Sequence, residues 1–206
     1  MELYFAPMSC SLATRIALYE TEQSAAFHQV VLSTKRTKNG EDYLSINPTG
    51  QVPALKTDDG DILTEGSAVL QYVADRAPGS GMAPPAGTIE RTRLHQWLNY
   101  ISSEIHKSVF YMLFNPAIPP AMKDFARGSI AVKYDFLSAH LSDHNYLVGS
   151  QFTVADAYLV TTLGWTQPAG IDLAPWAVLA AYRDRIMARP AVGRAFADEA
   201  AILAVG

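Results

Sequence analysis

The chain has 206 residues, of which 49% are hydrophobic and 17% are charged, and its formal net charge is −4. This length allows one large domain or two small ones, and the composition is typical of a globular protein with a hydrophobic core. The negative charge and the lack of a basic run argue against nucleic-acid binding. No uncharged apolar stretch of about 18 residues is present, so we expect no membrane span.

The chain contains one cysteine, Cys10. It cannot form an internal disulfide, which favours a reducing compartment. The N-terminal residues include Glu2 and lack the basic segment that begins a secretory signal. We therefore expect a cytoplasmic enzyme or binding protein.

Residues 1–79 alternate short strand-like segments with helix-like ones. Pro7 ends the first strand because it has no amide hydrogen to donate, and Asp59-Gly60 favours a tight turn between two strands. The expected order is strand, helix, strand, loop, strand, strand and helix. The segments are Glu2–Phe5, Ser11–Glu20, Phe27–Val31, QVPAL at 51–55, KTDDGDILTE at 56–65, and a helix that starts at Ser67.

The segment PGSGMAPPAG at 78–87 favours a linker, because neither helix nor sheet tolerates this composition in its interior. Beyond it we expect only helices. The supporting patterns are the apolar series Leu94, Leu98, Ile101 and Ile105, the segment Met122–Leu141, the capping-box pair Thr153 and Asp156 before an apolar run, and a last helix ending at Pro190. We predict an α/β domain at 1–79, a linker at 80–87 and an all-helical domain at 88–206.

Cys10 is a candidate reactive thiol. It follows the first predicted strand, and Ser9 is the expected N-cap of the following helix. Unpaired amides at a helix N-terminus favour a thiolate, which is the reactive form. The alternative is a small buried apolar side chain.

Two further motifs lie in the same domain. In NPTGQVPAL, Pro53 removes a donor from the following strand, and a cis Val52–Pro53 bond would explain its place. In LTEGSAVLQYVAD, Glu65, Gly66 and Ser67 precede a helix, where amides and a hydroxyl can bind a carboxylate and Glu65 can bind an ammonium group. A loop-to-strand transition and a simple helix cap are the ordinary interpretations.

Taken together, YFAPMSCSLATRIALYE, QVPAL, TEGSAVLQYVAD and FTVADAYL resemble the cytosolic glutathione transferases over essentially the whole chain, and most closely the bacterial beta class. The resemblance implies a thioredoxin-like fold for the first domain and glutathione as co-substrate. It also implies detoxifying conjugation of a small hydrophobic electrophile, and a homodimer. We expect no metal, because no group of His, Cys, Asp or Glu has metal-ligand spacing.

The resemblance also assigns roles in the first domain. The cysteine matching Cys10 lies beside the glutathione sulfur, and the backbone at Val52 and Pro53 pairs with the cysteinyl part. The motif at Glu65, Gly66 and Ser67 holds the γ-glutamyl end; many transferases have serine where this chain has Gly66. Lys35 matches a basic position that neutralises the glycine carboxylate.

In the helical domain, Asn99, Ser103 and His106 share a polar stripe, which we expect to face the cleft between the domains. The beta class has its asparagine and histidine at these places, so His106 is expected to hydrogen-bond to the sulfur or to Cys10. Other classes use a hydroxyl for this purpose. Ser11 is the reserve donor here, and Tyr4 is a weaker one because its strand side chain can face either side.

Three alternatives stay open. Cys10 can attack a mixed disulfide, giving thiol–disulfide exchange. Cis–trans isomerisation of a maleyl-type substrate ranks lower, because the zeta class usually has arginine where this chain has Ala13. The same fold can also serve a non-catalytic ligand-binding protein.

Overall fold

The computed structural model describes residues 1–205, and the chain forms two compact units. The first contains residues Met1–Met82 together with the chain from Arg189 onward, and the second contains residues Ala83–Ala188. The predicted linker at 80–87 spans this boundary. The predicted helical domain at 88–206 differs from the second unit at its C-terminal end, because the last helix packs with the first unit.

The first unit is built on a mixed sheet that has five strands among the described residues, in the order β3-β2-β1-β4-β5. β1 pairs in parallel with β2 and antiparallel with β4, with Leu3 opposite both Phe27 and Leu55. The predicted order of elements is confirmed, and β3 is an additional strand. The elements are β1 (Glu2–Phe5), α1 (Ser11–Glu20), β2 (Ala26–Val31), β3 (Arg36–Thr37), η1 (Tyr43–Ser45), β4 (Ala54–Lys56), β5 (Ile62–Leu63), α2 (Gly66–Asp75) and η2 (Pro78–Ser80).

Alternation along β1 directs its side chains to opposite sides of the sheet. Tyr4 lies in a buried cluster with Tyr43 and Val52. Its hydroxyl is 3.5 Å from Glu2 Oε2, and its ring stacks on His28. This cluster supports the loop that precedes β4.

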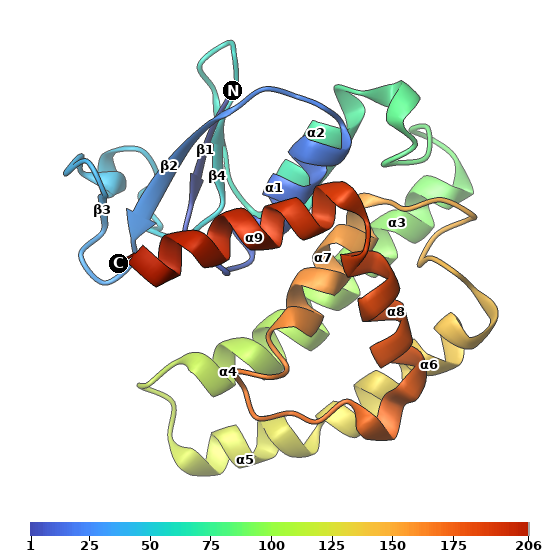
Figure 1. The fold of residues 1–206 in the computed structure, drawn as a ribbon. Helices are drawn as coiled ribbons and strands as arrows, with labels where there is room; N and C mark the ends of the chain where they lie inside the picture. The colour runs from blue at the N-terminus through green and yellow to red at the C-terminus, as the bar shows by residue number, and fades with distance from the viewer. Residues whose placement is uncertain (206) are drawn as a thin grey trace. The chain divides into compact units, whose positions relative to one another are not determined.

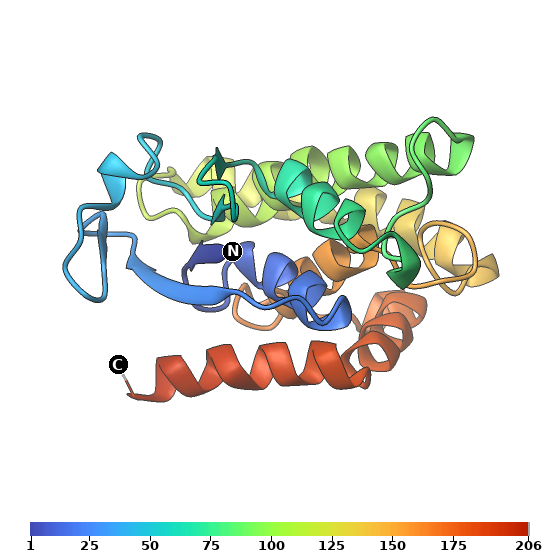
Figure 2. The ribbon, with the colours of Figure 1, turned by 90° about the horizontal axis from the view of Figure 1, so that it is seen from above.

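The C-terminal helix α9 (Pro190–Val205) packs against α1, which also packs against α2. Figure 2 shows α1 lying between these two helices. Three polar contacts join α9 and the residue that precedes it to α1: Arg189 with Glu20, Glu199 with Arg15, and Asp198 with Tyr19. The sequence patterns did not predict this helix, which is drawn in red in Figure 1.

The second unit is helical in the described part of the chain. Its elements are α3 (Ile89–Tyr100), η3 (Ile101–Phe110), α4 (Tyr111–Phe114), α5 (Pro120–Gly128), α6 (Ile130–Asp143), α7 (Val154–Gly164), η4 (Ala174–Trp176) and α8 (Ala177–Met187). The predicted Met122–Leu141 helix is in fact two helices, α5 and α6, which are separated by Ser129. The predicted capping box is confirmed: both Thr153 N and Thr153 Oγ1 donate to Asp156 Oδ2, at 2.9 and 2.8 Å.

The apolar series in the first predicted helix of this unit is buried: Leu94, Leu98, Ile101 and Ile105. From Ile101 to Phe110 the helix is of the π type, so Tyr111 N donates to His106 O five residues before it. Such widened turns are uncommon and frequently occur at functional sites. No helix among the described residues is long and apolar enough to cross a membrane.

Candidate active site

Cys10 lies at the N-cap position of α1, with its side chain half-buried. Its Sγ donates to Val52 O at 3.1 Å, which places the thiol beside the loop before β4. The predicted N-cap, Ser9, lies one residue earlier, and its Oγ accepts from Ser11 N at 3.3 Å. The N-cap prediction was therefore wrong by one residue, because the turn after Ala6 includes Ser9.

Ser11, the predicted reserve donor, is fully buried. Its Oγ accepts from Ala6 N and donates to Ala6 O, each at 3.2 Å, and lies 2.8 Å from Ser9 Oγ. These contacts fix the turn that leads to Cys10. The Ser11 hydroxyl therefore stabilises the backbone of this turn and is not exposed to solvent.

The loop before β4 contains a cis Val52–Pro53 bond, as predicted. Two side chains that the sequence patterns did not single out hold the preceding carbonyl: Tyr43 Oη and Asn47 Nδ2 both donate to Gln51 O, at 2.6 and 2.8 Å. Burial raises the pKa of Tyr43 to about 12, so its hydroxyl keeps its proton and remains a donor. The backbone at Val52 is held in place from within the first unit.

Lys35 lies next to the same loop. Its backbone has a φ of 54°, uncommon for a residue with a side chain, and its Nζ donates to Gly50 O at 2.8 Å. The ammonium group is therefore close to the segment that leads to Val52, where the resemblance places a basic residue.

Glu65 is the N-cap of α2, with a φ of 63°, and its side chain is exposed. Gly66 and Ser67 form the first turn of that helix. A Cβ placed on Gly66 would lie 3.8 Å from Pro53 Cδ, an ordinary van der Waals contact. The N-terminus of α2 therefore adjoins the cis-proline loop, and the three predicted motifs of the first unit meet around Val52 and Pro53.

A contact from the C-terminal helix also supports the Cys10 loop. Glu199 is fully buried and accepts from Met8 N at 2.6 Å and from Arg15 Nε at 2.9 Å. The Arg15 guanidinium lies over the rings of Phe5 and Phe27, at 4.5 and 3.9 Å. Burial raises the pKa of Glu199, although the Met8 amide and Arg15 oppose this shift. Met8 has a φ of 58°, so Glu199 holds an unusual backbone conformation two residues before Cys10.

In the second unit, the residues of the predicted polar stripe differ in their exposure to solvent. Asn99 and Ser103 are exposed, and Ser103 Oγ donates to Asn99 O at 3.0 Å within the helix. His106 is half-buried, and its Nδ1 lies 2.7 Å from Tyr158 Oη. The His106 ring also meets the edge of Trp165 at 5.0 Å.

Burial lowers the pKa of His106 to about 4, with a smaller contribution from Lys107. The imidazole is therefore neutral at physiological pH and has one N–H donor and one acceptor nitrogen. A neutral imidazole can donate a hydrogen bond, but it brings no positive charge.

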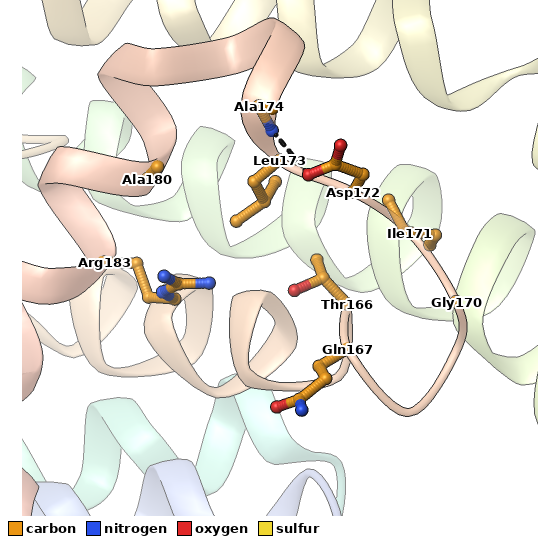
Figure 3. A pocket seen from close by; sticks show the side chains of 9 residues that line it. All are labelled: Thr166, Gln167, Gly170, Ile171, Asp172, Leu173, Ala174, Ala180 and Arg183. Carbon is orange, nitrogen blue, oxygen red and sulfur yellow. Dashed lines mark hydrogen bonds between the residues drawn. The ribbon is translucent and has the colours of Figure 1, made fainter.

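The second unit contains a pocket of about 560 Å³, to which Thr166, Leu173 and Arg183 contribute. Figure 3 shows the residues that line it. Its charged groups have partners nearby: Asp172 Oδ1 accepts from Ala174 N at 2.9 Å, and Arg183 donates to Asp184. The predicted site residues lie elsewhere. Among the residues that the structure describes, no three metal-ligating side chains are grouped as a metal site.

Two family profiles match the chain. The profile described as "Glutathione S-transferase, N-terminal domain" matches residues 7–76, and "Glutathione S-transferase, C-terminal domain" matches residues 100–190. The first match includes Cys10, the Val52–Pro53 bond and residues 65–67, and the second includes His106.

Relatives of known sequence or structure agree with these profiles. Glutathione S-transferase GstA of Escherichia coli O157:H7 is 40% identical over 199 residues, covering 97% of this chain and 98% of the relative. A sphingomonad glutathione S-transferase solved in complex with glutathione is 42% identical, with a TM-score of 0.93 over 97% of this chain and 99% of that one. A beta-class enzyme of Sphingomonas chungbukensis has the same identity and TM-score, over 97% and 98%.

Proposed function

The chain belongs to the glutathione S-transferase family, and we propose that it joins the sulfur of glutathione to a small hydrophobic electrophile. One observation carries this proposal: Cys10, the cis Val52–Pro53 bond and the N-terminus of α2 meet within the first unit. This arrangement brings a thiol, the backbone of the cis-proline loop and the first turn of a helix side by side.

Each part of glutathione has a proposed partner in this unit. The cysteinyl backbone pairs with Val52, and the sulfur lies beside Cys10. The γ-glutamyl carboxylate binds the first amides of α2 at Gly66 and Ser67, since a helix N-terminus attracts anions. The γ-glutamyl ammonium binds the exposed carboxylate of Glu65.

The glycine carboxylate is the remaining charged group of the tripeptide. We assign it to Lys35, whose ammonium group already lies at the edge of the loop through its bond to Gly50 O. In the second unit, Asn99 and Ser103 are proposed as polar contacts to the tripeptide, and His106 is proposed as a donor to its sulfur.

The reaction needs a thiolate. Hydrogen-bond donors directed at a sulfur stabilise its anion and lower the pKa of the thiol. The thiolate then forms a carbon–sulfur bond with the electrophile, while the electron pair of the broken bond moves to the leaving group or onto the adjacent carbon.

An apolar second substrate is supported by the aromatic residues of the second unit. Phe110 and Phe114 both meet Trp165 edge to face, at 5.4 and 6.4 Å. Tyr111 and Phe114 remain 45% and 47% exposed, which is high for large hydrophobic side chains. These aromatic faces are the proposed contacts of the electrophile.

The test compares glutathione conjugation and thiol–disulfide exchange in the wild type and in Cys10→Ala. Conjugation of glutathione to an aromatic electrophile should largely survive the substitution if glutathione itself is the nucleophile. Loss of conjugation in Cys10→Ala, with glutathione binding intact, would overturn this assignment.

Thiol–disulfide exchange is the second candidate, because Cys10 is a free, half-buried thiol at the start of a helix. In this reaction the Cys10 thiolate attacks the glutathionyl sulfur of a mixed disulfide, which forms a Cys10–glutathione disulfide and releases the other thiol. A second glutathione then attacks that disulfide, releases the Cys10 thiolate and leaves as glutathione disulfide. Cys10→Ala should reduce this activity to background, so the same variant separates the two candidates.

The assembly and location are also proposals. We propose a homodimer in the cytoplasm, as is usual in this family. Sedimentation equilibrium should give twice the chain mass of 22.4 kDa, and a single-chain mass at micromolar concentration would refute the dimer.

A further inference from the structure

His106 and Tyr158 meet inside the second unit, from elements that are far apart in the sequence. His106 belongs to the π-type helix η3, and Tyr158 belongs to α7, where it is 4% exposed. Tyr158 Oη and His106 Nδ1 are 2.7 Å apart, and the two rings are nearly perpendicular at 83°. This distance is that of a strong hydrogen bond between uncharged groups.

We propose that Tyr158 is a positioning residue whose hydroxyl donates to His106 Nδ1 and so keeps the imidazole proton on Nε2. The Nε2–H group is then the donor for the sulfur of glutathione. This last step rests on the proposed function, whereas the choice of tautomer is a property of the second unit alone.

The direction of the bond follows from the chemistry of the two groups. Neutral imidazole has one donor nitrogen and one acceptor nitrogen, and the hydrogen bond made by one of them decides where the proton lies. A phenol is a better donor than acceptor, because its oxygen lone pair is delocalised into the ring. Tyr158 is buried, so little water competes for its hydroxyl.

The surroundings hold both partners in this geometry. α7 begins with the capping box of Thr153 and Asp156, and nearly all of its residues are buried, so Tyr158 has little freedom to move. The His106 ring is further held by Trp165, and its backbone carbonyl accepts from Tyr111 N in the widened helix. Because the hydrogen bond to one ring nitrogen sets which nitrogen carries the proton, a fixed Tyr158 hydroxyl fixes the His106 tautomer.

Nitrogen NMR of the histidine rings in the full-length protein tests the tautomer without any ligand. His106→Asn identifies the His106 signals by their disappearance. In the wild type at neutral pH, Nδ1 should give the shift of an unprotonated ring nitrogen and Nε2 that of a protonated one. The opposite pattern would overturn the proposal, and this result does not depend on the folding of any Tyr158 variant.

Tyr158→Phe retains the ring and removes the hydroxyl. The His106 signals should then move toward an average of the two tautomers, and kcat for conjugation should fall about tenfold with little change in the KM for glutathione, because a misdirected donor weakens transition-state stabilisation. Tyr134→Phe is the matched control: Tyr134 Oη is buried in the same unit and has no hydrogen-bond partner among the described residues. It should leave the His106 signals and kcat unchanged.

These outcomes separate the positioning role of Tyr158 from the catalytic role of His106. Unchanged His106 signals and unchanged kcat in Tyr158→Phe would refute the positioning role. If His106→Asn itself leaves kcat unchanged, the proposed role of His106 in catalysis is wrong, while the tautomer measurement still decides the claim about Tyr158.

Discussion

The environment of His106 predicts a specific dependence of stability on pH. The pKa of this residue is about 4 in the folded protein, against an ordinary value of 6.5, because burial disfavours the charged ring. The folded state therefore binds fewer protons than the unfolded state between these values. It follows that the free energy of unfolding falls as the pH is lowered through 6.5, and that the loss levels off below about 4.

The size of the effect follows from linkage. Each pKa unit corresponds to about 1.4 kcal/mol, so His106 should cost the fold about 2 kcal/mol by pH 5 and about 3 kcal/mol by pH 4, relative to pH 7. His106→Gln keeps a polar side chain that does not titrate, and it should remove this part of the pH dependence. All other titrating groups are shared, so the difference between the two proteins isolates His106.

Urea unfolding of the wild type and of His106→Gln at pH 7 and pH 5 gives this difference. The control is His95→Gln, which replaces an exposed imidazole on α3 and should follow the wild type at both pH values. Parallel pH dependence of the wild type and His106→Gln would show that burial does not hold His106 neutral in the folded protein.

Three further predictions concern residues with defined contacts. Asp156→Ala leaves four buried donors without this acceptor, the amides of Leu147 and Thr153 and the hydroxyls of Thr153 and Tyr182, and should lower the free energy of unfolding by at least about 3 kcal/mol in urea titrations; a loss below about 1 kcal/mol would contradict this account. Glu199→Ala leaves the Arg15 charge buried and unpaired, and should cost about 3–5 kcal/mol in the same assay, whereas an unchanged midpoint would show that the pair is not buried in solution. Gly66→Ser has room for its side chain and adds a hydroxyl at the proposed carboxylate site, so the dissociation constant of glutathione should fall about fivefold by calorimetry; weaker binding would speak against that site.

Local signals account for the parts of the fold that the sequence predicted well. Pro7 ends the first strand, the apolar spacing of 11–20 marks α1, and the Asp59-Gly60 turn is observed, with Gly60 at a φ of 95°. β3 was missed because two residues are too few to show an alternating pattern. α9 was missed because Pro190 was interpreted as the end of a helix, whereas it is the first residue of the next one, where proline needs no amide hydrogen.

The candidate site also contains parts that local sequence signals predict and parts that they do not. The cis-proline loop and the start of α2 carry their signals in a few consecutive residues, so the sequence could predict them. The contact of Glu199 with Met8 joins residues 191 positions apart, and that of His106 with Tyr158 joins residues 52 apart. Nothing in the local sequence marks such pairs, because tertiary packing alone brings them together.

The central claim is that glutathione binds where Cys10, the cis-proline loop and the N-terminus of α2 meet. A crystal structure of the protein soaked with glutathione tests this claim most directly. The proposal predicts the sulfur in contact with Cys10 Sγ, the cysteinyl backbone paired with Val52, and the γ-glutamyl group at Glu65 and Ser67. Glutathione bound away from these residues, or no bound glutathione at millimolar concentration, would contradict it.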